Sequence, residues 1–109
     1  MENIVDASDK NFNELLSSSK LAIVHFSASW CFPCKVVASS IEEVAPSHRS
    51  VLFIKADIDM CKELADRFGI MNVPTLVAFK GGKAVERVFG NVPKPYLEYL
   101  LKKHLDQTG

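Results

Sequence analysis

Two cysteines three positions apart are the residues in this chain that most directly suggest chemistry. Cys31 and Cys34 belong to the run SWCFPCK, residues 29–35. Such a pair can form and break a disulfide bond, or it can supply half of a zinc site. Zinc needs about four ligands, usually from a second closely spaced pair, and the remaining cysteine and three histidines show no such spacing. We therefore predict a redox pair and no metal site.

The composition is that of an ordinary globular protein. The chain has 109 residues, 48% of them apolar and 24% charged, which predicts a single domain over residues 1–109. Lys+Arg and Asp+Glu both number 13, a balance that argues against nucleic-acid or membrane-surface binding. No apolar run is long enough to span a membrane, and the start MENIVDASDK does not resemble a secretory signal. We expect a cytoplasmic protein whose thiols are kept reduced.

Strand-like apolar runs alternate with helical spacing along the chain, so we expect an α/β fold. A mixed sheet of about five strands should lie between two layers that hold about four helices. The expected elements are a strand at 3–5, a helix capped by Ser8, a strand at 21–26, a helix from the cysteine motif to Pro46, a strand at 51–54, a short helix at 61–68 ended by Gly69, a hairpin of 75–79 and 84–89 turning at Gly81-Gly82, and a closing helix at 97–105 after Pro95.

The cysteine motif falls where a buried strand ends and a helix begins. Cys31 should therefore lie at the helix N-terminus, where free amide donors and the helix dipole favour a thiolate. Cys34 shares the inward stripe of Val37 and Ile41, which predicts an exposed attacking thiol and a half-buried resolving thiol. Pro33 stiffens the first helical turn at little cost.

Further short motifs follow the cysteine motif in the sequence. The run WCFPCK is followed about forty residues later by IMNVPT, residues 70–75, and then by Gly81-Gly82 and Gly90. With these features in this order, nearly the whole chain resembles the thioredoxin family. The resemblance implies the thioredoxin fold and a protein-disulfide reductase. In that activity Cys31 would attack a target disulfide, and Cys34 would resolve the mixed disulfide.

The resemblance also implies roles for residues around the cysteines. Trp30 would offer a flat apolar surface, with its indole N–H held by Asp59. Pro74 would be a cis proline facing the cysteines, and the backbone of Val73 would pair with a substrate strand. Gly90 would border the same groove.

The same resemblance implies partners and an electron source. The partners would be disulfide-containing proteins and a thioredoxin reductase that passes on electrons from NADPH, with no bound cofactor and a monomeric protein. Two alternatives stay open: an oxidant or isomerase of the same fold, and a non-catalytic adaptor.

His25 departs from the family pattern, which commonly has a buried aspartate there with a lysine nearby, here Lys55. One interpretation is a neutral imidazole that accepts a proton during exchange, since burial favours the uncharged ring. The other is a core histidine bonded to a backbone carbonyl.

Three other side chains raise questions. Phe32 stands where the family commonly has glycine; it either changes target choice and redox potential or is mere variation. Lys35 is expected to add local positive potential. Cys61 lies on an apolar stripe, which favours a buried inert thiol over a regulatory one.

Overall fold

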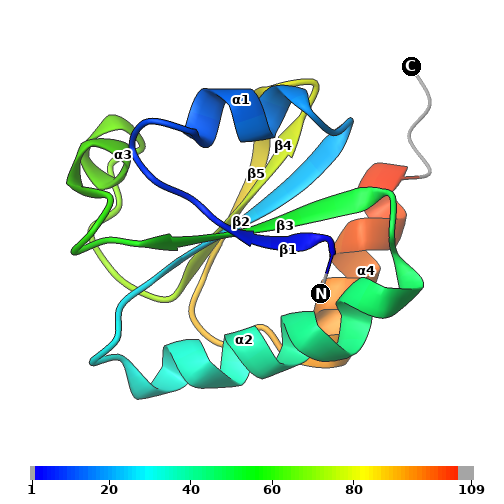
Figure 1. The fold of residues 1–109 in the computed structure, drawn as a ribbon. Helices are drawn as coiled ribbons and strands as arrows, with labels where there is room; N and C mark the ends of the chain where they lie inside the picture. Colours follow the sequence, from blue (N-terminus) through cyan, green and yellow to red (C-terminus); the bar gives the residue numbers. More distant parts are fainter. Residues whose placement is uncertain (1, 106–109) are drawn as a thin grey trace.

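A five-stranded mixed sheet runs through the middle of the molecule, with helices on both faces (Figure 1). The computed structural model describes residues 2–105. Within them, no helix is long and apolar enough to cross a membrane. The elements are β1 (Ile4–Asp6), α1 (Phe12–Ser17), β2 (Leu21–Ser27), α2 (Phe32–Val44), the 3-10 turn η1 (Ala45–Ser47), β3 (Val51–Asp57), α3 (Lys62–Arg67), β4 (Thr75–Lys80), β5 (Lys83–Phe89) and α4 (Lys94–Leu105). The predicted fold class and order of elements are confirmed.

The strands lie in the order β1-β3-β2-β4-β5. β1, β3 and β2 are parallel, whereas β4 is antiparallel to β2, and β5 to β4. β2 is therefore central, with Ile23 opposite Phe53 on one side and Ala78 on the other. A strand with neighbours on both edges and helices over both faces is buried throughout, which explains its continuous apolar run.

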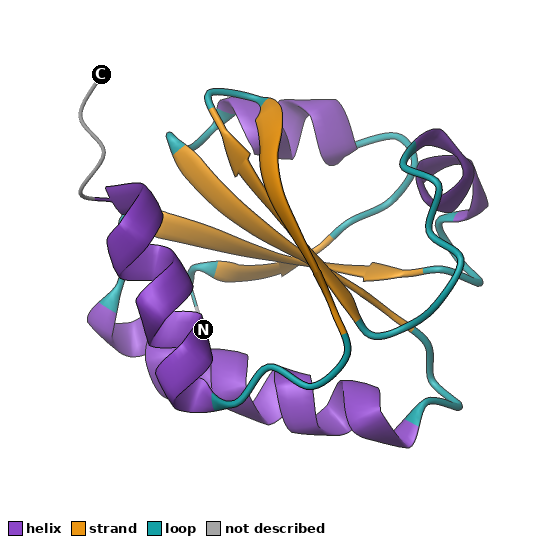
Figure 2. Cartoon of the chain, turned by 180° about the vertical axis from the view of Figure 1, so that it is seen from behind, coloured by secondary structure: helices purple, strands orange, loops and turns teal. Residues whose placement is uncertain are grey.

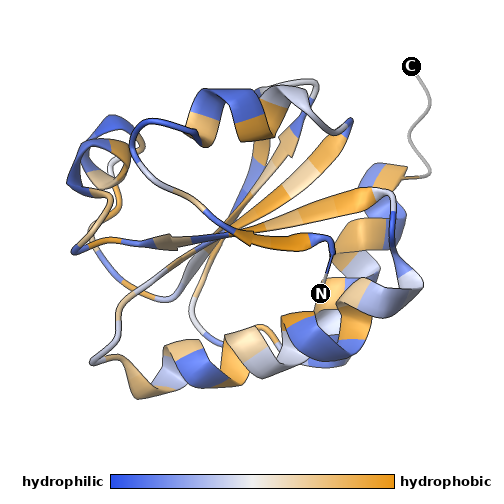
Figure 3. Cartoon of the chain, in the orientation of Figure 1, coloured by the Kyte–Doolittle hydropathy of each residue, from blue (hydrophilic) through white to orange (hydrophobic). Residues whose placement is uncertain are grey.

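Alternate residues of β2 divide the core into two halves. Leu21 and Ile23 face the helices α2 and α4, while Ala22, Val24 and Phe26 face α1 and α3. Figures 1 and 2 show the two pairs of helices on opposite faces of the sheet, and Figure 3 shows that the strands are predominantly hydrophobic. By the same period-two alternation His25 points toward the α2 face, the face that carries the cysteine motif.

The predicted start of the first helix is wrong. Ser8 does not cap the first helix, because α1 begins at Phe12 with Asn11 as its N-cap. Ser8 and Asn11 instead exchange hydrogen bonds: the backbone N–H of Ser8 donates to Asn11 Oδ1 at 2.7 Å, and the backbone N–H of Asn11 donates to Ser8 Oγ at 3.1 Å. This pairing closes a turn ahead of the helix, a common alternative use of short polar side chains.

Asn3 fastens the start of the chain to the segment between α2 and β3. Its Nδ2 donates to the carbonyls of Ala45 (2.9 Å), His48 (3.0 Å) and Val51 (3.2 Å). We expect Asn3→Ala to lower the free energy of unfolding by about 1–3 kcal/mol, because it removes three partly buried hydrogen bonds between the start of the chain and this segment. Urea titration would measure the loss, with the exposed Asn13→Ala as control; equal stability of the two variants would contradict this role for Asn3.

Candidate active site

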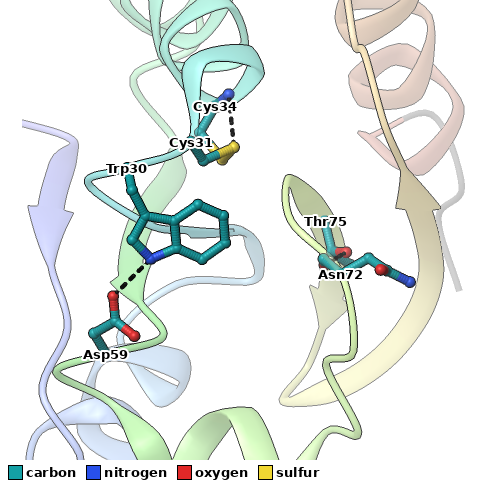
Figure 4. Close-up of a disulfide and its surroundings, with 6 residues drawn as sticks. All are labelled: Trp30, Cys31, Cys34, Asp59, Asn72 and Thr75. Carbon is teal, nitrogen blue, oxygen red and sulfur yellow. Dashed lines mark hydrogen bonds between the residues drawn. A yellow bond between two sulfur atoms is a disulfide. The ribbon is translucent and has the colours of Figure 1, made fainter.

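Cys31 and Cys34 are joined by a disulfide at the N-terminus of α2, with their Cα atoms 5.4 Å apart (Figure 4). Cys31 is the N-cap residue, with an extended backbone of φ −96° and ψ 106°. Its Sγ accepts a hydrogen bond from the backbone N–H of Cys34 at 3.2 Å. Pro33, which has no N–H to satisfy, occupies the first turn of α2. The predicted position of Cys31 is confirmed, and one of the helix's free amide donors already points at its sulfur.

The expected difference in exposure between the two cysteines is wrong for this disulfide-bonded state. Cys31 is 5% exposed and Cys34 is 3% exposed. Both pack with Ala28, and the side chains of Ile58 and Val73 lie against them. Because the bridge ties Cys31 to the buried Cys34, neither residue presents much surface.

Trp30 lies beside the disulfide and is 68% exposed. Its indole Nε1 donates to Asp59 Oδ2 at 3.0 Å, as the resemblance implied (Figure 4). The backbone N–H of Asp59 in turn donates to Asp57 Oδ1 at 2.8 Å. These two bonds hold a large apolar ring at the surface next to the sulfurs.

The loop before β4 faces the disulfide from the other side (Figure 4). The Val73–Pro74 peptide bond is cis, as the resemblance implied, and the Val73 side chain packs against the cysteines. The backbone N–H of Gly90 donates to the Pro74 carbonyl at 2.9 Å, and its φ of 98° is one that side chains rarely allow. Within residues 2–105 the backbone N–H and C=O of Val73 make no hydrogen bond, so both are free to pair with an extended segment.

His25 is 1% exposed and lies opposite Lys55 of β3 and Leu76 of β4 in the sheet register. Neither ring nitrogen has a hydrogen-bond partner among the described residues. Burial, and then the positive charge of Lys55, lower the pKa of His25 from 6.5 to about 4. The ring is therefore neutral near pH 7. The interpretation that His25 is bonded to a backbone carbonyl is wrong.

A cavity of about 310 Å³ connects His25 with Cys34. It touches a second cavity of about 320 Å³ through shared lining residues, His25 and Lys55 among them. The charged residues that line the two cavities are Asp6, Lys35, Glu42, Lys55 and Asp57. A space of this size, lined by charged side chains and an unpartnered imidazole, has room for water between His25 and the resolving cysteine.

The remaining predicted residues divide between surface and core. Phe32 is 73% exposed beside Cys31, so its ring is open to a partner. Cys61 is buried, and its thiol donates to the carbonyl of Ala7 at 3.3 Å. Burial, and then nearby Asp9 and Asp57, raise the pKa of the Cys61 thiol. This supports the prediction that it is inert, since the reactive form is the thiolate.

No metal centre emerges from the part of the chain that the structure describes: residues 2–105 contain no group of three or more His, Cys, Asp or Glu side chains placed to hold an ion. The sequence reasoning also missed three strongly exposed apolar side chains, Met60, Met71 and Phe89. In the sequence they look like ordinary core residues, and only the fold reveals that they are exposed.

Comparisons with known proteins agree with this geometry. The family model "Thioredoxin" matches residues 3–103. The chain is 40% identical over 103 residues to a thioredoxin from Staphylococcus haemolyticus, covering 94% of this chain and 98% of that protein. It is 41% identical over 91 residues to the thioredoxin of Alicyclobacillus acidocaldarius, covering 83% and 87%. A mutant thioredoxin from Halobacterium salinarum superposes with a TM-score of 0.90 at 26% identity, covering 99% and 96% of the two chains.

Likeness of this extent, combined with the bonded cysteine pair, defines a dithiol–disulfide oxidoreductase. The chain belongs to the thioredoxin family. Its activity is protein-disulfide reduction by reversible oxidation of the Cys31–Cys34 pair, as the sequence motif predicted.

Proposed function

We propose that Cys31 is the attacking thiol and Cys34 the resolving thiol. The Cys31 thiolate attacks one sulfur of a target disulfide, forms a mixed disulfide and expels the other target sulfur as a thiolate. The Cys34 thiolate then attacks Cys31 Sγ and expels the second target thiolate. Two electrons pass from the dithiol to the target, and the two released thiolates take up two protons. The hydrogen bond from the Cys34 amide to Cys31 Sγ is the observation that carries this assignment.

The residues around the disulfide hold the target in this proposal. Trp30 and Phe32 contact the target on the α2 side of the sulfur. The free backbone groups of Val73 pair with the segment that carries the target cysteine, in the manner of an added strand. Pro74 and Gly90, tied to each other by a backbone hydrogen bond, form the opposite wall.

We assign proton transfer at Cys34 to His25. The thiol of Cys34 must lose its proton before it attacks Cys31, and a neutral imidazole in the same cavity can accept it. Lys55 acts as a tuning residue, because its charge adds to the effect of burial in lowering the pKa of the ring. Lys35 lines the same cavity and adds positive potential near the thiolates.

We propose the electron source and cellular setting by analogy with the family. A thioredoxin reductase would return the Cys31–Cys34 bridge to the dithiol with electrons from NADPH, and the dithiol itself carries the two electrons without a bound cofactor. We propose a monomeric protein, folded as one domain, that works in the cytoplasm.

Insulin reduction driven by dithiothreitol, together with the redox potential in glutathione buffers, tests this function. We expect catalysed insulin reduction and a potential clearly more negative than the roughly −180 mV of protein disulfide isomerase. A potential near or above that value would favour an oxidant or isomerase. A protein that neither reduces insulin nor forms mixed disulfides would instead be an adaptor.

A further inference from the structure

His25 borders two cavities, and only one of them reaches Cys34. The first cavity, of about 310 Å³, is the one that joins the ring to the resolving cysteine. The second, of about 320 Å³, is lined by His25 together with Ile4, Ile41 and Glu42, and among the described residues no cysteine lines it. The imidazole therefore has a further space beside it that the sulfur chemistry does not use.

The two cavities meet beneath a small side chain of α2. His25, Ala38 and Lys55 line both of them. Cys34, Ala38 and Glu42 follow one another at intervals of four residues, so they lie in one row along α2. Glu42 is about two turns, or about 12 Å along the helix axis, beyond Cys34. Because Ala38 carries only a methyl group, space remains between the two ends of this row.

Both nitrogens of the His25 ring are available for proton transfer. The ring is buried, and neither nitrogen has a hydrogen-bond partner among the described residues. In a neutral imidazole one nitrogen carries a proton and the other accepts one. The ring can therefore take up a proton on one side and release a different proton on the other side without turning.

A proton that arrives on this ring must be passed on quickly. Burial and the positive charge of Lys55 disfavour the imidazolium, which is why the pKa of His25 lies at about 4. If no second base takes the proton, it returns to Cys34 before the thiolate has attacked Cys31. That second base must share a cavity with the ring.

Charged groups surround His25 on several elements. Those that line its two cavities come from β1, α2 and β3 and are Asp6, Lys35, Glu42, Lys55 and Asp57. On the other side, β4 places the uncharged Leu76 opposite the ring. Three of the charged groups are carboxylates, which are the candidates for the second base.

Glu42 is the carboxylate placed best to take the proton. Asp57 Oδ1 already accepts a hydrogen bond from a backbone N–H. Asp6 lies opposite Lys55 in the sheet, and Lys55 lies opposite His25, so a lysine separates Asp6 from the ring. Glu42 shares the second cavity with the ring, is exposed to solvent, and makes no hydrogen bond or ion pair within residues 2–105.

We propose that Glu42 carries protons between His25 and solvent, as the outer end of a path that begins at Cys34. The S–H bond of Cys34 breaks, and its proton joins one nitrogen of the ring. The proton on the other nitrogen crosses the second cavity, which is large enough to hold water, to the Glu42 carboxylate. The electron pair left on the Cys34 sulfur attacks Cys31, and the Glu42 carboxyl gives its proton to the buffer. The inference rests on the proposed function, in which Glu42 acts through the ring and not on the sulfurs.

Chemical rescue by a small base tests this path. Release of the target from the mixed disulfide would be measured in a single turnover near pH 7, in dilute MOPS, a bulky sulfonate buffer. We expect Glu42→Gln to slow release by about tenfold, a smaller loss than for His25→Leu, which removes the first proton acceptor. Added imidazole, which is small enough for the second cavity, should restore the rate of Glu42→Gln, whereas the same amount of additional MOPS should not. A purely structural role for Glu42 would not produce this difference between the two bases.

Glu43→Gln is the matched control, because it makes the same change at the next residue of α2, which is exposed and lines neither cavity. It should release the target at the wild-type rate. Wild-type release in Glu42→Gln, or slow release that imidazole does not restore, would overturn the inference. Slowing by Asp6→Asn in place of Glu42→Gln would overturn it too, because the proton would then leave through the first cavity. A wild type that forms no mixed disulfide with insulin would instead refute the proposed function itself.

Discussion

Cys34→Ser is expected to stop turnover and to leave the protein covalently attached to its targets. Cys31 can still attack a target disulfide, but a serine hydroxyl at position 34 cannot displace the target from the mixed disulfide. We expect catalysed insulin reduction to fall by on the order of 10³-fold or more. When two residues act as one catalytic unit, removing either of them abolishes nearly all of the enzyme's activity. Non-reducing electrophoresis after incubation with insulin would show the trapped species.

Two controls make this result specific. Cys31→Ser should be inactive and trap nothing, because the attacking sulfur is then missing. Cys61→Ser should turn over like the wild type, since the Cys61 thiol is buried and bonded to the Ala7 carbonyl. Trapping by Cys31→Ser in place of Cys34→Ser would reverse the assigned roles.

His25→Leu is expected to slow release of the target from the mixed disulfide by about 10²-fold near pH 7, the lower end of what general base catalysis supplies. In the wild type the release rate should fall as the pH drops through about 4, where the imidazole becomes protonated. The variant should lack the inflection near pH 4, because it has no titrating group at that position. Single-turnover measurements across pH, with His48→Leu as control, would record both effects.

The same substitution should change how stability depends on pH. His25 has a pKa of 6.5 in an unfolded chain and of about 4 in the folded protein, so the unfolded state binds the proton more tightly. The neutral ring of His25 therefore makes its full contribution to the free energy of unfolding above pH 6.5. That contribution is lost as the pH falls to about 4. Relative to His25→Leu, the wild type should lose on the order of 3 kcal/mol of unfolding free energy over that interval.

Urea titrations of both proteins at pH 7 and pH 4 would measure this difference, and other titrating groups largely cancel in the comparison. An unchanged release rate with an unchanged pH profile would remove His25 from the mechanism. Parallel stability curves for the two proteins would show that the ring is not buried in its neutral form.

The residues whose roles follow from local rules could be predicted from the sequence. The run SWCFPCK after a buried strand was enough to place Cys31 at the start of α2, because the end of the strand and Pro33 in the first helical turn are both local signals. The order of elements followed in the same way from apolar spacing. Resemblance to a family supplied the Trp30–Asp59 bond and the cis Pro74, which no periodicity reveals.

Features that depend on distant parts of the chain could not be predicted. The near-equal burial of the two cysteines depends on Ile58 and Val73, which come from two other segments. The unpartnered ring of His25 depends on the cavity that it faces, which the sequence does not describe. The exposure of Met71 could not be predicted for a related reason. An apolar residue is expected to be buried in the core until the fold shows its surroundings.

Selective alkylation of the reduced protein tests the central claim, which is that the N-terminus of α2 makes one sulfur a ready nucleophile. Iodoacetamide rates for Cys31 should rise with a midpoint well below the value of about 8.5 that is typical of a free thiol, and Cys34 should react far more slowly. Peptide mapping of the labelled protein would resolve the two sites. A midpoint for Cys31 at or above 8.5, with both sulfurs equally slow at neutral pH, would contradict the account.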